Sequence, residues 1–130
     1  MIIVDSSVWI DYFNGQTTAQ TLILDALLGQ GSIALGDLIL LEVLQGFHAD
    51  ADYQKARQLF RAFPIFTMVG ESHAVRAAEY YRALRRKGIT ARKTVDVLIE
   101  TFCIAQDHRL LFSDRDFNPF VDHFGLQAVT

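Results

Sequence analysis

The sequence predicts an α/β fold with a doubly wound, mainly parallel sheet that is flanked by helices on both faces. Short apolar runs alternate along the chain with longer segments of helical periodicity. The apolar runs are uninterrupted by polar residues, as expected of strands that are buried on both faces. No internal repeat, low-complexity tract or shift in composition divides residues 1–130, so we expect one domain.

The composition is that of a globular protein with a substantial core. Of the 130 residues, 51% are hydrophobic and 12% are aromatic. The single cysteine, Cys103, excludes an intramolecular disulfide and a cysteine-based zinc cluster, and it suits a reducing cytoplasm. No segment approaches the roughly 20 apolar residues of a membrane span. We therefore expect a cytoplasmic protein without a membrane partner, and, because Asp5 interrupts the apolar start, without a signal peptide.

The first twelve residues predict a strand that leads directly into a helix. Three apolar residues end at Asp5, and Ser6 or Ser7 is the candidate N-cap of the helix. In open parallel sheets, ligands bind at the carboxyl ends of the strands. A carboxylate at that position needs a partner, which could be a metal ion, an arginine or the backbone donors of the helix N-terminus.

The remaining elements follow from periodicity and from capping residues. A helix is predicted wherever apolar residues recur every three or four positions, and a strand wherever a short apolar run stands between breaks. The helix at 37–46 is apolar nearly all round, so we expect it to be buried. The other predicted helices are 17–28 capped by Thr17, 50–63, 71–87 and 95–106 capped by Thr94, and the other predicted strands are 32–35, 65–69, 110–112 and 127–129.

Several acids should meet at one edge of this sheet. Asp5 and Asp114 each follow an apolar strand, and Asp96 lies in the first turn of its helix. Glu42 is a carboxylate inside an apolar helix, which is costly unless it is neutralised or bound, and Asp116 is a further candidate ligand. Each acid alone is most simply a cap, a helix-start acid or a turn residue. Together they predict a site for a hard cation, Mg²⁺ or Mn²⁺, able to activate water and stabilise a phosphoryl displacement.

Four short motifs around these acids carry a resemblance that runs essentially from end to end. They are Val-Asp5-Ser-Ser-Val-Trp-Ile-Asp, Leu-Leu-Glu42-Val-Leu-Gln-Gly46, Arg92-Lys-Thr-Val-Asp96-Val-Leu-Ile and Leu-Leu-Phe-Ser113-Asp114-Arg-Asp116-Phe117. In this order they resemble the PIN-domain proteins, and more closely the VapC family of toxin endoribonucleases. The resemblance implies a PIN-like fold and a Mg²⁺-dependent endoribonuclease, with Mn²⁺ as a substitute, that hydrolyses RNA by metal-activated water. It also implies a homodimer and a small VapB-like antitoxin.

Carried over residue by residue, the resemblance implies the following roles. The catalytic, metal-binding acids are Asp5, Glu42, Asp96 and Asp114, with Asp116 as a fifth metal ligand, and the candidate RNA contacts are Ser7, Arg92, Lys93 and Ser113. One position departs from the family pattern, since Glu100 stands where a small residue is usual. On a helix it lies one turn after Asp96. It either holds water or a basic residue or crowds the site, and the sequence leaves these alternatives open.

Other functions remain to be weighed against this one. A phosphatase with Asp5 as nucleophile would normally have Asp-x-Asp after the first strand and a lysine after the last strands, and neither is present. A degenerate module that binds RNA or a partner without cleavage is the second alternative. The complete set of acids argues against it, but Glu100 keeps it open. The basic residues between positions 82 and 93 are either a solvated helix end or a guide for RNA.

Overall fold

The sheet of the computed structural model, which describes residues 1–90 and 93–130, is parallel throughout. Its strands stand in the order β3-β2-β1-β4. Each neighbouring pair is parallel, with Ile2 opposite both Ile33 and Arg109. The strands are β1 (Ile2–Val4), β2 (Ile33–Gly36), β3 (Ile65–Phe66) and β4 (Arg109–Leu111).

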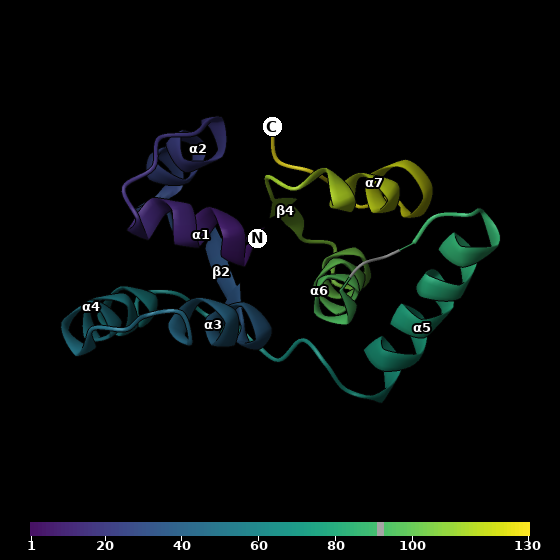
Figure 1. The fold of residues 1–130 in the computed structure, drawn as a ribbon, viewed down its shortest axis with the longest axis horizontal. Coiled ribbons are helices and arrows are strands. Elements are labelled where there is room, and N and C mark those ends of the chain that lie inside the picture. Colours follow the sequence, from purple (N-terminus) through teal and green to yellow (C-terminus); the bar gives the residue numbers. More distant parts are fainter. Residues whose placement is uncertain (91–92) are drawn as a thin grey trace.

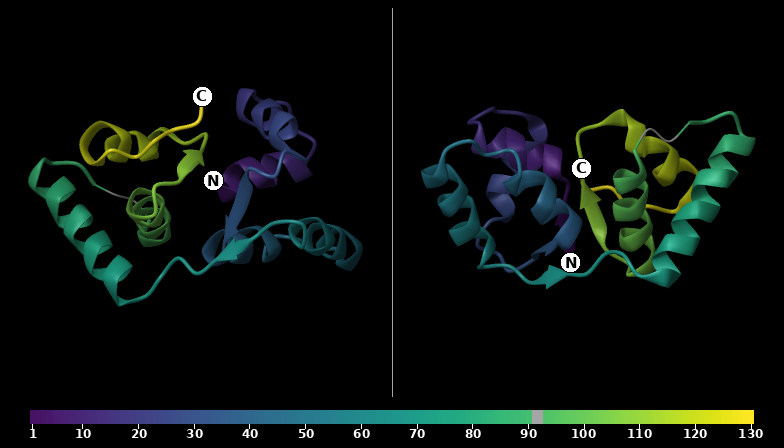
Figure 2. Two further views of the ribbon diagram at one scale, coloured as in Figure 1. Left: turned by 180° about the vertical axis from the view of Figure 1, so that it is seen from behind. Right: turned by 60° about the horizontal axis from the view of Figure 1, so that its bottom comes forward.

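Helices cover both faces of this sheet, which confirms the predicted fold class. Figure 1 shows α1 to α4 on one side and α5 to α7 on the other, and the two views of Figure 2 agree. The helices are α1 (Ser6–Phe13), α2 (Ala19–Leu27), α3 (Asp37–Leu44), α4 (Asp50–Phe60), α5 (Glu71–Arg86), α6 (Thr94–Ala105), the 3₁₀ turn η1 (Arg115–Phe117) and α7 (Asn118–Phe124).

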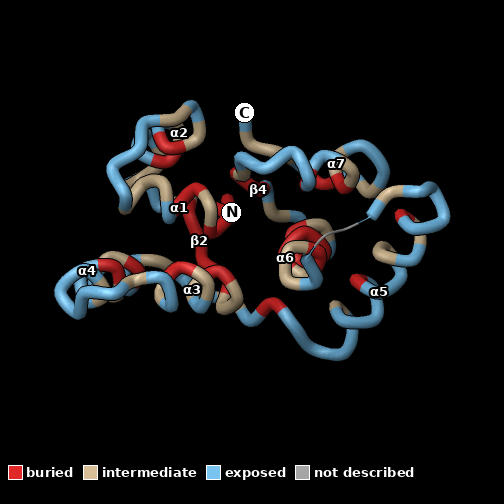
Figure 3. The backbone as a smooth tube through the Cα atoms, viewed as in Figure 1, coloured by how far each residue is buried: buried red, intermediate tan, exposed pale blue. Residues whose placement is uncertain are grey.

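The core is centred on the strands, which explains why they are apolar without alternation. Buried positions are concentrated along the sheet and on α6 (Figure 3). On the α1 side, the Trp9 ring stacks on Phe13 at 6.1 Å and meets the edge of Phe60 at 5.1 Å. The strand residues with no exposed surface are Ile3, Val4, Ala34, Leu35, Leu110 and Leu111.

The prediction that α3 is buried all round is wrong. Only Ile39 and Val43 are buried, and Leu41 is 58% exposed. A helix that covers one face of a sheet turns its opposite side outward whatever the residues there are. α3 therefore presents apolar surface that the described residues leave uncovered.

Several predicted boundaries also differ from the structure. The N-cap of α1 is Asp5 rather than Ser6 or Ser7, and Thr18 rather than Thr17 caps α2 through a reciprocal pair of hydrogen bonds with Thr21. Thr94 is the first residue of α6, with Lys93 at the N-cap. The predicted final strand is reduced to one bridge between Leu110 and Ala128. None of the described helices has the length and apolar character needed to cross a membrane.

The topology brings the two ends of the chain together at one edge. β1 and β4 are neighbours, Val4 pairs with Leu111, and the Asp5 N–H donates to the Leu111 carbonyl at 2.9 Å. Residues that follow β1 and β4 must therefore lie side by side at the carboxyl edge of the sheet.

Candidate active site

Asp5 occupies the centre of this edge because β1 delivers it there and α1 begins immediately after it. Its carboxyl oxygen Oδ2 accepts from the Ser7 N–H at 3.2 Å and from Ser7 Oγ at 2.6 Å. The other oxygen, Oδ1, is buried and has no hydrogen-bond partner among the described residues. Burial raises the pKa of Asp5 and the charge of Asp114 adds to this, while the hydrogen bonds from Ser7 oppose it.

Glu42 approaches the same edge from α3. Its carboxylate is half-buried and accepts a hydrogen bond from Ser6 Oγ at 3.1 Å. Burial raises the pKa of Glu42, Asp5 raises it further, and the Lys93 ammonium lowers it. The two serines after Asp5 therefore have separate tasks, since Ser6 orients Glu42 and Ser7 orients Asp5.

Asp96 lies in the first turn of α6 and faces both of these acids. Burial raises its pKa to about 6, to which the charges of Asp5, Glu42 and Asp114 contribute while Lys93 opposes them. The mutual effects on pKa show that the acids predicted from the sequence lie within electrostatic reach of one another. Four of the five, Asp5, Glu42, Asp96 and Asp114, form one cluster.

Asp114 and Asp116 come from the turn that follows β4. Asp114 caps η1, and its Oδ1 accepts from the Asp116 N–H at 2.9 Å. Both side chains are exposed. The charge of Asp116 raises the pKa of Glu100. It is not among the main causes of the raised pKa values of Asp5, Glu42 and Asp96. Asp116 therefore stands beside Glu100, at the margin of the four-acid cluster.

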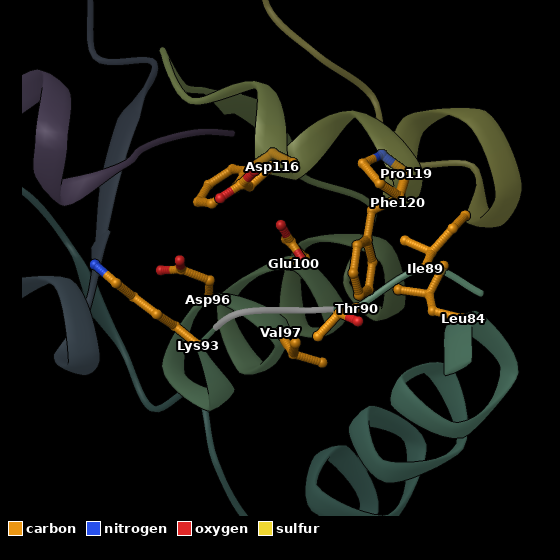
Figure 4. A pocket seen from close by; sticks show the side chains of 11 residues that line it. Leu84, Ile89, Thr90, Lys93, Asp96, Val97, Glu100, Asp116, Pro119 and Phe120 are labelled. Atoms are coloured by element: carbon orange, nitrogen blue, oxygen red, sulfur yellow. The ribbon is translucent and has the colours of Figure 1, made fainter. Parts of the chain in front are cut away.

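Glu100 is more deeply buried at the site than its position in the sequence indicated. It is 1% exposed, although it lies on α6 only one turn beyond Asp96. Burial raises its pKa to about 9, and Asp96, Asp5, Asp114 and Asp116 all contribute. Figure 4 shows Asp96, Glu100 and Asp116 around one cavity, with Leu84, Ile89 and Phe120 on its apolar side.

The oxygen ligands of this edge match the preference of a hard divalent cation. The cluster contains a buried carboxylate oxygen on Asp5 without a partner among the described residues, and burial together with the charges of neighbouring acids raises the pKa of Asp5 and of Asp96. The side chains do not yet converge: among the described residues, no three Asp, Glu, His or Cys side chains are arranged to hold one ion. Binding would therefore require the carboxylates to close around the ion.

The residues predicted to contact RNA lie in different surroundings. Ser7 is committed to Asp5 through its hydroxyl, and Ser113 is exposed between β4 and η1. Lys93 is exposed at the start of α6 and extends past Asp96 (Figure 4). Arg92 lies outside the described residues. Cys103 is fully buried, and burial raises the pKa of its thiol, which agrees with a core position.

Comparison with known proteins assigns the chain to a family. The PIN domain profile matches residues 2–120. Ribonuclease VapC11 of Mycobacterium tuberculosis is 30% identical over 132 residues, covering 100% of this chain and 98% of that protein, and VapC ribonuclease Mb1587 of Mycobacterium bovis matches equally.

Solved structures show the same fold at lower identity. VapBC2 from Rickettsia felis, bound to a DNA fragment from its promoter, has a TM-score of 0.74 at 18% identity and covers 99% of this chain and 98% of that one. VapBC-1 from nontypeable Haemophilus influenzae has a TM-score of 0.76 at 14% identity, with 99% and 97% covered. The chain therefore belongs to the PIN-domain family and, within it, to the VapC proteins.

Proposed function

We propose that this protein is a Mg²⁺-dependent endoribonuclease that hydrolyses RNA phosphodiester bonds and acts as the toxin of a toxin–antitoxin pair. The observation that carries the proposal is the buried Oδ1 of Asp5, which has no hydrogen-bond partner among the described residues and lies within electrostatic reach of Asp96 and Asp114. The named ribonuclease activity of the VapC relatives supports it. Mn²⁺ should substitute for Mg²⁺, because both prefer oxygen ligands.

The chain's own residues divide the work of such a reaction. Asp5, Glu42, Asp96 and Asp114 would hold the cation, which when bound supplies an activated water and stabilises charge on the phosphate. Ser6 and Ser7 fix two of these carboxylates through the hydrogen bonds described above. Lys93 brings a positive charge to the rim of an otherwise anionic site, where an RNA phosphate has to approach.

Cleavage of RNA by the purified protein tests this function directly. We expect cleavage of a labelled single-stranded RNA with Mg²⁺ or Mn²⁺, loss of cleavage in EDTA and recovery when Mg²⁺ is returned in excess. Zn²⁺ alone should support it poorly, because no His or Cys belongs to the carboxylate cluster. Robust cleavage in excess chelator would rule out the metal mechanism. RNA binding without cleavage under every metal would instead identify a degenerate module.

Substitution of Lys93 tests its role at the rim. Lys93→Gln should weaken RNA binding and reduce the slope of log affinity against log salt by about 0.7, the value for one lost phosphate contact on a single strand. Lys55→Gln, an exposed lysine on α4, is the matched control and should leave the slope unchanged. An equal slope of log affinity against log salt for both variants would show that Lys93 makes no contact with an RNA phosphate.

We also propose that a small VapB-like antitoxin covers part of the α1–α4 side and that the toxin works as a homodimer. Leu22 on α2 and Leu41 on α3 are 60% and 58% exposed, and a cavity of about 110 Å³ lined partly by Ile10 and Phe47 lies between α1 and the end of α3. Exposed apolar surface of this kind is typical of a partner interface. A solved structure with the same fold, from Klebsiella pneumoniae, is a toxin–antitoxin complex.

Co-expression tests the partner. The chain alone should arrest growth, and the small reading frame expected beside its gene should relieve the arrest. Leu41→Asp should weaken this protection without changing cleavage by the purified toxin, whereas Val75→Asp, an equally exposed position on α5, should not. Light scattering should give the mass of a dimer. A strictly monomeric protein that is harmless alone and indifferent to its neighbour would defeat this proposal and leave the nuclease proposal standing.

A further inference from the structure

Glu100 is a carboxylate whose burial nothing described in the structure offsets. It is 1% exposed, and the influences that act most strongly on its pKa, which are burial and the charges of Asp96, Asp5, Asp114 and Asp116, all raise that pKa. Its position is fixed by α6, because a residue four places after Asp96 lies one turn along the same face. The side chain points from that face toward Asp116 (Figure 4).

The space in front of Glu100 is large enough for a water molecule or a small ion. The cavity that it lines has a volume of about 20 Å³, and roughly 10–15 Å³ is enough for one water molecule. Its charged lining is formed by Asp96, Glu100, Asp116 and Lys93. The Lys93 ammonium lowers the pKa of Asp96 and of Glu42, and its side chain extends past Asp96 and away from Glu100 (Figure 4).

A buried carboxyl in this setting is stabilised either by a proton or by a cation. As a protonated acid Glu100 would need an acceptor for its hydrogen, and no such hydrogen bond is present among the described residues. An apolar side chain would fill the same place at lower cost. A divalent cation would offset the charge of Glu100 and of the neighbouring acids together. Asp5 Oδ1, a buried oxygen without a hydrogen-bond partner among the described residues, is a further acceptor at this edge that a cation could meet.

We propose that Glu100 is a further ligand of a divalent cation, which it shares with Asp96 and Asp116 on the α6–η1 side of the site. This inference rests on the proposed metal-dependent function and adds a ligand to it at a position where the family usually has a small residue. The three side chains have to draw together around the ion, because they are not yet arranged to hold one. Glu100, with its long side chain, reaches the cavity from behind Asp96.

Titration of the full-length protein with Mn²⁺ in the absence of RNA tests this role. Glu100→Gln keeps the size of the side chain and removes its charge, so it should weaken Mn²⁺ binding by about tenfold or more, as changes around metal sites commonly do. Glu79→Gln, an exposed glutamate on α5, is the matched control and should bind as the wild type does. Wild-type affinity in Glu100→Gln would overturn the inference.

A second measurement keeps the test independent of enzyme activity and of one variant. Mn²⁺ should raise the Tm of the wild type more than that of Glu100→Gln, since a ligand of the folded state stabilises it by an amount that grows with the logarithm of its affinity. Should Glu100→Gln fail to fold, Glu100→Ala takes its place, and the same loss of affinity is expected. A Glu100→Ala protein that gains as much Tm from Mn²⁺ as the wild type overturns the inference too.

The inference and the proposed function fail in different ways. Asp96→Asn in the same titration should lose Mn²⁺ binding more severely than Glu100→Gln. A wild-type protein that cleaves RNA with Mg²⁺ while Glu100→Gln binds Mn²⁺ equally well refutes only the role of Glu100. A wild-type protein that binds no Mn²⁺ and cleaves in EDTA refutes the metal-dependent function, and the inference with it.

Discussion

We expect the Asp5→Asn variant to fold as the wild type does and to cleave RNA at least about 100-fold more slowly, a loss typical of removing one preorganised electrostatic group from an active site. Asn keeps the shape of the side chain and is itself a good N-cap, so the start of α1 should survive. What is lost is the charge of an oxygen that is buried without a partner. Asp96→Asn should have the same effect, because Asp96 faces Asp5 and Glu42 from α6.

Cleavage rates and thermal unfolding of the same preparations check this prediction. Asp25→Asn, on the exposed side of α2, is the matched control and should retain the wild-type rate. The metal-free Asp5→Asn protein should be at least as stable as the wild type, since one member of a repelling, buried cluster has lost its charge. A wild-type rate in either site variant would contradict the assignment of the metal-binding acids.

The metal-free protein should lose stability as the pH rises from about 5 to about 9. The folded state raises the pKa of Asp96 from 3.8 to about 6 and that of Glu100 from 4.5 to about 9. Between the unfolded and folded values, the folded protein binds more protons than the unfolded chain, so the free energy of unfolding falls with pH. For Glu100 alone the slope reaches at most about 1.4 kcal/mol per pH unit. Urea unfolding in EDTA, at intervals across this range, measures it.

Glu100→Gln separates the two contributions. It should abolish most of the decline above about pH 6, because Gln has no proton to lose there, and leave the decline that comes from Asp96. Glu79→Gln should keep the full wild-type decline. A wild-type slope in Glu100→Gln, or a metal-free protein that becomes more stable above pH 6, would show that Glu100 does not carry the raised pKa.

Most of the sheet could be predicted from sequence because β1, β2 and the last two residues of β4 are buried and therefore form unbroken apolar runs. β1 and β4 were predicted within one residue for this reason. The same logic failed for α3, since apolar composition does not reveal which side of a helix has a neighbour, and Leu41 faces outward. The same logic also failed at the end of the chain. The predicted strand at 127–129 forms a single bridge, between Ala128 and Leu110 of β4. Pairing depends on the partner strand as much as on local sequence.

The sequence was enough to predict that the site lies at the carboxyl ends of the strands. It was not enough to predict the contacts of each side chain there. Asp5 and Asp114 follow strands, and parallel topology alone brings them together. The hydrogen bonds that Ser6 and Ser7 make to separate acids depend on side-chain geometry that spacing does not define. The burial of Glu100 was missed as well, because it arises from η1 and α7, which pack over α6 from a distant part of the chain. The unusual residue at position 100 was the available signal.

The order of the strands has a consequence for the synthesis of this protein on the ribosome. β1 is synthesised about a hundred residues before its second neighbour, β4, although the two strands pair in the finished sheet. Until β4 arrives, β1 has one open edge and Asp114 has not joined Asp5, so a nascent chain has neither a finished sheet nor a complete set of acids. Such long-range pairing also slows folding. Under the proposed nuclease function, the chain would thus be inactive until the residues that follow β4 have been synthesised and have folded.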